Sequence, residues 1–427
     1  MQFNKNEPGH GNEKGITNSF QRIRLITILL AMLVSVANSQ DTEVILRTFA
    51  DEIISSSRFE FVDKSDGEIY ASTKGLPPNK LLKVEAMYLH WHYTSALVHD
   101  GLLSLGTVLG DESYSGFGMN YFRFVFENEP YLERIKSEEY SIEGLERFGK
   151  FRGLWDNGAQ AAALINVYQM DQQEAYLEYL EKVADFFSNY DKDPANKSRK
   201  KNIDQLYTQG VFMARMGKLT GDATYFDYCV EKVLTSDSLF YDPVTGLYDQ
   251  IYYPEQQSTN KIKWLRGIGW SAMALINILD CLPEDHPGYN HVLNSYYRKI
   301  KGIAAYQTRT GLWKHLVNHP DSFDETSGSV YIVYSIARGI NLGLLDPVYR
   351  DVAMAGWAGI MSKRQADGSI AGSTSGVSSS TSPAYFLNYP RVANSDHLIG
   401  PLFLAGAEMI RLYRTYNKPV PKDWNIQ

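Results

Sequence analysis

Apolar residues recur along this chain with the spacing of helices, and runs that alternate as strands do are scarce. Between 91 and 110 they mostly fall one, three, four and seven positions apart, which is typical of a buried helix. Most of these apolar segments are followed by a polar turn and a second, more charged helix, as over 176–190 and 225–234. The pattern predicts six apolar helices, over 91–110, 159–168, 206–216, 269–282, 329–342 and 398–416.

The polar turns repeat a motif in which an aspartate precedes a tyrosine by a few residues. The aspartate can cap the next helix while the tyrosine packs back on the previous one. The motif recurs at roughly 50 to 65 residue intervals, the length of one helix hairpin with its return loop. Its tyrosines are Tyr114, Tyr176, Tyr225, Tyr289 and Tyr349. An open solenoid is one solution, but six hairpins close naturally into a ring, so we expect an all-α fold, an (α/α)6 barrel of six helix hairpins.

The first 39 residues predict a secretory signal peptide rather than part of the barrel. Arg22 and Arg24 precede an apolar run from Leu25 to Ala37, and small residues follow it. The run is too short to cross a hydrocarbon core of about 30 Å, although a single uncleaved anchor is the alternative. We therefore expect an exported, periplasmic or secreted protein with no membrane attachment after cleavage, in which residues 40–427 form a single barrel domain.

Charge and composition exclude several classes of protein. With 44% apolar and 21% charged residues the chain has a globular composition, which excludes intrinsic disorder. Lys and Arg number 42 against 49 Asp and Glu, so no broad basic surface is available for nucleic acid. Cys229 and Cys281 allow at most one disulfide and fit no metal-ligand spacing. No dinucleotide, phosphate-loop or zinc-protease motif is present, so we expect neither a cofactor nor a metal.

Unusual residues gather where the chain enters the apolar helices. In a barrel of hairpins these entry loops meet at one end, where a pocket can form. A carboxylate there is also a good helix cap, so capping is the alternative for Asp156, Asp204 and their counterparts. Five of the six entries carry acids, Arg, His or Trp, at 155–158, 203–205, 264–270, 325–329 and 395–397.

Trp264, Arg266 and Trp270 suggest a flat, cationic wall for an anionic sugar. Aromatic faces stack on a sugar ring, and the guanidinium offers a planar fork to a carboxylate. The alternative is that both tryptophans are core residues at a tight helix contact. His90 and His92 lie two apart and make a poor metal pair, so packing or pocket lining is expected. The basic stretch 197–201 leads into Asp204 and is either a solvated loop or a source of positive charge near an anionic substrate.

At these residues the chain resembles the unsaturated uronyl hydrolases of glycoside hydrolase family 105, which is related to family 88. The resemblance runs from Trp91-His92-Tyr93 to Ala405-Gly406-Ala407-Glu408. Its most specific matches are Asp204-Gln205-Leu206-Tyr207, the segment from Trp264 to Trp270, Glu325-Thr326-Ser327 and the segment from Ile336 to Ile340.

The resemblance implies that Asp204 is the general acid/base, that Arg266 with Trp264 and Trp270 binds substrate, and that Asp156 is the second pocket carboxylate. Gln250, His92 and His397 are the further substrate-binding candidates. The implied reaction removes a terminal 4,5-unsaturated uronate from lyase-generated oligosaccharides by hydrating its double bond, without a cofactor. The implied partner is that oligosaccharide, linked to rhamnose as in rhamnogalacturonan or ulvan fragments, with glycosaminoglycan fragments also possible.

Departures from the family pattern place the neighbouring sugar in doubt more than the reaction. Ile268 replaces a usual Asn, and Asn202 stands where Trp is common. The histidine expected within 246–250 is absent, as is a His-Lys pair before Asp204. Because cations crowd that approach, we expect tolerance of, or preference for, fragments with extra negative charge such as sulfated rhamnose. A conventional glycosidase, epimerase or lyase on the same barrel, or a non-catalytic exported sugar-binding protein, are the alternatives.

Overall fold

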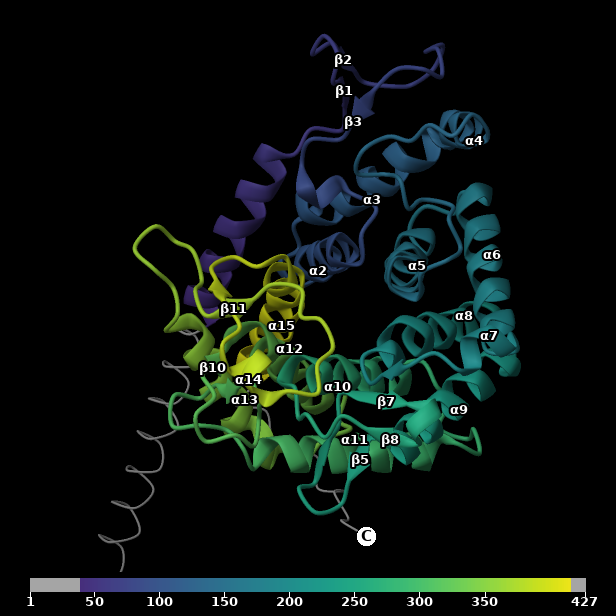
Figure 1. The fold of residues 1–427 in the computed structure, drawn as a ribbon. Coiled ribbons are helices and arrows are strands. Elements are labelled where there is room, and N and C mark those ends of the chain that lie inside the picture. Colours follow the sequence, from purple (N-terminus) through teal and green to yellow (C-terminus); the bar gives the residue numbers. More distant parts are fainter. Residues whose placement is uncertain (1–38, 416–427) are drawn as a thin grey trace, which may run out of the picture.

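Six helices line the inside of a ring in the computed structural model, which describes residues 39–415. Each inner helix packs on the next, and the last contacts the first, so the ring closes (Figure 1). The predicted (α/α)6 barrel is confirmed, with inner helices close to the expected ranges. They are α2 (Tyr93–Leu109), α5 (Leu154–Tyr168), the π-helical turn η2 (Tyr207–Val211) continued by α8 (Phe212–Thr220), α10 (Leu265–Leu279), α12 (Thr326–Asn341) and α15 (Asp396–Thr415).

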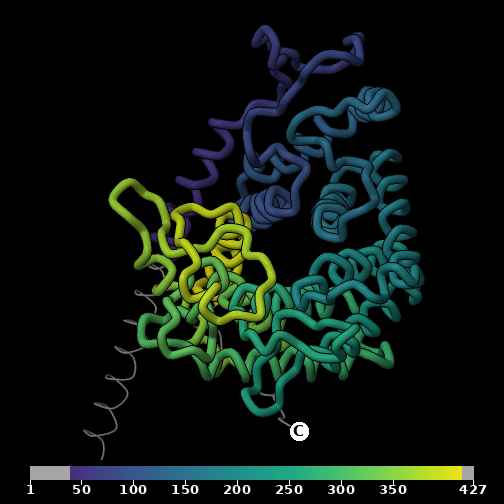
Figure 2. The backbone as a smooth tube through the Cα atoms, in the orientation of Figure 1, coloured from purple at the N-terminus to yellow at the C-terminus, as the bar shows by residue number. Residues whose placement is uncertain are grey.

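The outer layer contains a helix that the apolar pattern did not predict. Five outer helices each pack on the inner helix before them: α3 (Glu112–Glu127), α6 (Glu174–Tyr190), α9 (Ala223–Phe240), α11 (Tyr289–Ala304) and α13 (Arg350–Met361). The sixth place is taken by the helix over 39–56, at the start of the described chain. A side chain at Gly406 of α15 would collide with Leu46 of this helix, and Arg47 reaches Asp111 at 2.6 Å. The chain therefore closes its ring by returning its C-terminal helix to its N-terminal one (Figure 2). The predicted signal segment lies outside the described residues except for Ser39.

The repeated turn motif is confirmed at some turns and wrong at others. Asp111, Asp222 and Asp346 accept hydrogen bonds from the backbone N–H two residues on and cap the elements that follow. Asp171 and Asp285 do not cap their helices. Capping depends on placing the carboxylate at the N-cap itself, and at these two turns another residue occupies that position.

Short antiparallel strands and helical turns occupy the long loops. Strand β4 (Lys201–Asn202) pairs with β7 (Ile251–Tyr253), and Asn202 is opposite Ile251. This register brings the segment before Asp204 alongside the segment that contains Gln250. The other strands are β1 (Phe61–Asp63), β2 (Ile69–Tyr70), β3 (Leu82–Lys83), β5 (Tyr241–Asp242), β6 (Leu247–Tyr248), β8 (Ser258–Thr259), β9 (Trp313–Lys314), β10 (Asp324–Glu325), β11 (Ser373–Thr374) and β12 (Arg391–Val392). The remaining helical segments are η1 (Met87–Leu89), α4 (Glu129–Ser137), α7 (Pro194–Lys197), η3 (Pro254–Gln256), η4 (Pro347–Tyr349) and α14 (Pro383–Leu387).

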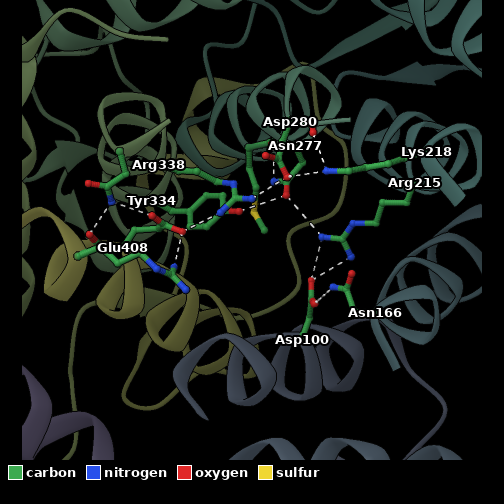
Figure 3. A network of polar contacts seen from close by, with 12 residues as sticks. Asp100, Asn166, Arg215, Lys218, Asn277, Asp280, Tyr334, Arg338 and Glu408 are labelled. Atoms are coloured by element: carbon green, nitrogen blue, oxygen red, sulfur yellow. Dashed lines mark hydrogen bonds and ion pairs between the residues drawn. The ribbon is translucent and has the colours of Figure 1, made fainter. Parts of the chain in front are cut away.

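A network of polar side chains joins all six inner helices (Figure 3). Asp100 of α2 pairs with Arg215 of α8 at 3.2 Å, and Arg338 of α12 pairs with Glu408 of α15 at 2.8 Å. Because these groups are largely withdrawn from water, each needs its partner, and the pairing fixes the helices relative to one another. The other members include Asn166, Asn277, Asp280 and Tyr334.

Two further observations concern the described residues as a whole. None of the helices in the range 39–415 has both the length and the apolar character needed to cross a membrane. Cys229 and Cys281 are both free, so the one disulfide that the sequence allowed is not formed.

Candidate active site

Aromatic side chains from all six inner helices meet near the N-terminal ends of those helices. Trp270 lies at the centre, with its ring centroid 4.8 Å from that of Tyr207, 4.6 Å from Tyr331 and 5.7 Å from Trp155. Tyr93 contacts Trp155 at 5.4 Å and His397 at 5.6 Å between ring centroids. We call these rings the aromatic cluster. The prediction that the inner-helix N-termini gather at one end is thereby confirmed.

Asp204 lies in the loop that precedes η2 and lines a cavity of about 230 Å³. Its side chain is buried, and Oδ1 has no hydrogen-bond partner among the described residues. The cavity is polar, and backbone and side chains from four separate loops enclose it. The lining residues are Lys200, Asn202, Asp204, Gln250, Ile251, Trp264, Val377, Ser378 and Ser379.

Burial raises the pKa of the Asp204 carboxyl to about 7, against an ordinary value of 3.8. Backbone N–H groups of Asp204 and Gln205 and the charge of Arg266 act in the opposite direction, but desolvation outweighs them. A helix cap would have a lowered pKa, because it accepts hydrogen bonds as an anion. The helical stretch that leads into η2 begins at Gln205, directly after Asp204, but the structure gives no capping hydrogen bond from a side chain at this helix start. The raised pKa and the unpartnered Oδ1 therefore argue against a capping role for Asp204.

Trp264 and Gln250 share the cavity with Asp204. Trp264 is the N-cap residue of α10, and its indole N–H is buried without a partner within 39–415. Gln250 accepts a hydrogen bond from the Asn260 side chain at 3.0 Å, and its backbone carbonyl accepts from the N–H of Ile203. The short β4–β7 pairing thus holds Gln250 beside the loop that carries Asp204.

Arg266 is buried, and both terminal nitrogens of its guanidinium donate hydrogen bonds to oxygens of the protein. Nη1 donates to the backbone and side-chain oxygens of Thr374 at 2.8 Å each, and Nη2 donates to the Ser375 carbonyl at 2.6 Å. The loop that these bonds hold continues directly to 377–379 in the cavity wall. The Nε–H is buried without a partner among the residues described. The guanidinium lies over Trp264, 5.1 Å from the ring centroid, as the sequence suggested. Its hydrogen bonds show that it also holds the loop at Thr374 and Ser375.

Asp156 and His92 lie beside the aromatic cluster rather than in the cavity wall. Asp156 is in the first turn of α5, which begins at Leu154 and not after Gly158 as the sequence predicted. Its carboxylate accepts the backbone N–H of Tyr93 at 3.0 Å and pairs with Arg147 at 2.8 Å. His92 is the N-cap residue of α2 and lies 4.3 Å from Tyr93 between ring centroids. Both residues therefore position the start of α2.

His397 is buried at the start of α15 and joins two other polar groups. Its Nδ1 lies 2.6 Å from Oδ1 of Asp396, and its Nε2 lies 2.7 Å from the Tyr93 hydroxyl.

Trp270, the remaining residue of the predicted wall, is 2% exposed at the centre of the aromatic cluster. A side chain on the adjacent Gly269 would collide with Tyr331, so Trp270 sits at the tight, glycine-mediated helix contact that the core alternative describes.

Sequence reasoning missed two parts of the site. The stretch 372–382 supplies Val377, Ser378 and Ser379 to the cavity, and its run of Ser, Thr and Gly was a compositional signal. Tyr93 was noted only inside a motif, although the charges of Arg266, Asp396, Asp204 and Asp156 all act on it. No local pattern marks such a tyrosine, because its surroundings come from helices far apart in the chain.

The basic segment is divided between two cavities. Lys200 lines the cavity of Asp204 and donates a hydrogen bond to Ser379. Lys197, Arg199 and Lys201 instead line a neighbouring cavity of about 250 Å³ between this loop, α6 and α9. Lys200 and Asn202 belong to the walls of both cavities. The expectation that all four cations crowd the approach to Asp204 is therefore wrong for three of them.

Residues 73–413 match the family model of Glycosyl Hydrolase Family 88. Among curated proteins, the chain is 29% identical over 173 residues to an unsaturated 3S-rhamnoglycuronyl hydrolase of Alteromonas sp. (strain LOR). It is 28% identical over 134 residues to an unsaturated rhamnogalacturonyl hydrolase of Bacillus subtilis. These matches cover 39% and 31% of this chain, and they span only 42% and 39% of the length of the two relatives.

Solved structures share the fold at low sequence identity. A possible family 105 member from Salmonella enterica superimposes with a TM-score of 0.68 at 18% identity, covering 88% of this chain and 95% of the other. An unsaturated glucuronyl hydrolase from Bacillus sp. GL1 superimposes with a TM-score of 0.56 at 16% identity, covering 91% and 97%. The family model covers most of the chain, including every element of the barrel that contributes to the cavity. The chain therefore belongs to glycosyl hydrolase family 88.

Proposed function

We propose that this protein is a hydrolase that removes a terminal 4,5-unsaturated uronate from an oligosaccharide. The observation that carries the proposal is Asp204, a buried carboxyl whose pKa is raised to about 7 and whose Oδ1 is unpartnered beside a polar cavity. A general acid works best when its pKa lies near the working pH, because it then holds a proton that it can still give up. The curated relatives support this choice, since they are named as an unsaturated 3S-rhamnoglycuronyl hydrolase and an unsaturated rhamnogalacturonyl hydrolase.

The reaction needs one group that both gives and takes a proton. Asp204 donates its proton to C4 of the substrate double bond, and the oxygen of a water molecule adds at C5. The second proton of that water returns to Asp204, so the carboxyl is restored. The resulting hemiketal at C5 opens the ring, and the bond to the neighbouring sugar breaks with that sugar leaving as an alcohol. One molecule of water is consumed overall.

The arrangement of carboxylates favours this reaction over ordinary glycoside hydrolysis. Ordinary hydrolysis needs two carboxyl groups that face each other across the glycosidic bond. The second candidate here, Asp156, accepts the Tyr93 N–H and pairs with Arg147, and it does not line the cavity of Asp204. Its role in the proposal is to hold α2 and the aromatic cluster, which leaves Asp204 as the proton-transfer group.

We further propose that the substrate carries rhamnose and an additional anionic group beyond the unsaturated residue. The second cavity supports this choice, because Lys197 and Arg199 line it and their side chains have no hydrogen bond or ion pair to any described residue. It adjoins the Asp204 cavity through Lys200 and Asn202, so a sugar linked to the uronate lies within its reach. A sulfate ester suits such cations, and one curated relative is named as an unsaturated 3S-rhamnoglycuronyl hydrolase.

The proposed reaction is tested by following the ultraviolet absorbance of lyase-generated oligosaccharides, which is lost when the conjugated double bond is hydrated. We expect wild-type protein to abolish the absorbance and Asp204→Asn to be about 10²- to 10⁴-fold slower, the usual contribution of general acid–base catalysis. Asp222→Asn is the matched control, because it changes a surface helix cap of α9 and should retain full activity. Activity on saturated sugars with no loss of absorbance would make the protein a conventional glycosidase instead.

The choice of substrate is tested separately with sulfated and unsulfated unsaturated disaccharides. We expect kcat/KM to favour the sulfated one, and Lys197→Ala/Arg199→Ala to reduce that preference. High salt should also reduce it, since exposed charges are screened with a Debye length of about 8 Å at physiological ionic strength. Lys74→Ala/Arg58→Ala removes two exposed cations elsewhere and should leave the preference unchanged. Equal kcat/KM for both disaccharides would refute the assignment while leaving the reaction itself intact.

A further inference from the structure

Asp396, His397 and Tyr93 form a chain of two short hydrogen bonds where α15 meets α2. Oδ1 of Asp396 lies 2.6 Å from Nδ1 of His397, and Nε2 of His397 lies 2.7 Å from the Tyr93 hydroxyl. His397 is 4% exposed and lies 304 residues from Tyr93 in sequence. Only the closure of the ring, in which the last inner helix packs on the first, brings the three groups together.

The carboxylate of Asp396 fixes which atom carries each hydrogen in this chain of hydrogen bonds. An ionised carboxylate only accepts hydrogen bonds, so the imidazole nitrogen that faces it, Nδ1, must carry a hydrogen. In a neutral imidazole the other nitrogen then has a lone pair, and the hydrogen between it and Tyr93 belongs to the phenol. Burial and the charge of Arg266 lower the pKa of His397 to about 4, which keeps the ring neutral at neutral pH. Burial opposes ionisation of Asp396, but the contact with His397 outweighs it and the pKa falls to about 2.

The Tyr93 hydroxyl can therefore only accept further hydrogen bonds. Its single hydrogen is used by His397, so any other group that it contacts must donate to it. Burial raises the pKa of Tyr93, so the hydroxyl keeps that hydrogen at neutral pH. Tyr93 is partly exposed, its ring contacts Trp155 and Trp270, and the charges of Asp204 and Arg266 act on it. It is therefore an oriented acceptor at the edge of the site.

We propose that Asp396 and His397 are positioning residues that hold the Tyr93 hydroxyl as a hydrogen-bond acceptor for an O–H group of the bound sugar. This inference rests on the proposed function, because it assigns the acceptor to the substrate of that reaction. The sugar hydroxyls are the O–H donors that such a substrate brings into the site, and a fixed acceptor orients the ring without loss of conformational entropy in the protein.

The protonation state is tested without substrate by nitrogen-15 NMR of protein labelled at histidine. The two tautomers of a neutral imidazole have distinct nitrogen shifts, and His397→Leu identifies the signal. We expect the Nδ1–H tautomer for His397 near neutral pH, and the same tautomer in Tyr93→Phe because Asp396 is unchanged. The Nε2–H tautomer in wild-type protein would overturn the inference, since Tyr93 would then be free to donate.

The positioning role is tested by a double-mutant cycle on the unsaturated substrate. Tyr93→Phe should lower kcat/KM about tenfold or more, because the sugar hydroxyl loses its acceptor in a desolvated place. His397→Leu should cost a similar factor in wild-type protein but little in the Tyr93→Phe background, since it acts through Tyr93. Tyr176→Phe is the matched control, a buried hydroxyl of outer helix α6 with no partner in the described chain, and should be without effect.

Each result has a definite meaning. Unchanged kcat/KM in Tyr93→Phe, or losses that multiply fully in the double variant, would overturn the positioning role. The melting temperature of every variant separates misfolding from loss of orientation, because a purely structural histidine would lower stability equally in both backgrounds. If wild-type protein hydrates no unsaturated uronate, the proposed function fails, and the substrate assignment of Tyr93 is overturned with it. The NMR test needs no substrate, so the Nδ1–H tautomer of His397 would still support the hydrogen-bond chain in that case.

Discussion

Replacing Asp204 with asparagine should change the pH dependence of stability in a direction that identifies the protonated carboxyl. The pKa of this carboxyl is about 7 in the folded protein and 3.8 as its ordinary value, which applies to the unfolded chain. Between these two values the folded state binds more protons than the unfolded state, so the contribution of Asp204 to stability is fully present below pH 3.8 and is lost as pH rises through 7. A difference of roughly three pKa units corresponds to about 4 kcal/mol.

The variant carries no charge at this position, so it does not suffer that loss. We expect the free energy of unfolding of Asp204→Asn, relative to wild type, to rise progressively between pH 4 and pH 8, by up to about 4 kcal/mol. Urea denaturation at several pH values, monitored by circular dichroism, measures this difference directly and needs no substrate.

Asp222→Asn supplies a control of opposite sign. The backbone and side chain of Thr224 lower the pKa of Asp222, so its contribution to stability is present above the ordinary pKa and lost as pH falls. Relative to wild type, the Asp222→Asn variant should therefore lose stability as pH rises toward the ordinary value of 3.8, and the difference should be flat from pH 4 to pH 8. A stability difference between Asp204→Asn and wild type that is flat from pH 4 to pH 8 would refute the raised pKa, and with it the reason for choosing Asp204 as the acid.

Three further predictions concern the surroundings of the site. Arg266→Lys keeps the charge but loses the planar fork that holds Thr374, so kcat/KM should fall markedly, and an unimpaired variant in the absorbance assay would contradict the role of this loop. Glu408→Gln removes the charge that pairs with Arg338 and should lower the free energy of unfolding by about 1–3 kcal/mol, because Arg338 keeps its pair with Asp280; urea denaturation measures this, and an unchanged free energy would show that the pair does not hold the helices. Gly158→Ala places a methyl group 2.1 Å from a backbone oxygen of η2, so we expect a loss of about 1–3 kcal/mol together with reduced activity, and a fully stable variant would mean that α5 and η2 separate easily.

The helix hairpins of the barrel could be predicted from the sequence, because the information for them is local and repeated. Each inner helix carries its own apolar periodicity, and α10 is buried along its whole length as its composition suggests. The spacing of the turns then limits the arrangement to helix hairpins of one size. What the pattern could not show was the sixth outer helix over 39–56, because its partner α15 lies at the other end of the chain.

Asp204 could also be singled out by its motif, but its chemistry depends on its surroundings in the folded protein. Its pKa depends on removal from water by loops that are distant in sequence, including the segment 377–379. The same holds for Arg266, which donates hydrogen bonds to a loop 108 residues away in the sequence. It also holds for Tyr93, whose hydroxyl forms a hydrogen bond with His397, 304 residues away. Residue type fixes what a side chain can do, whereas its desolvation and its hydrogen-bond partners, which select what it does, arise only when the ring closes.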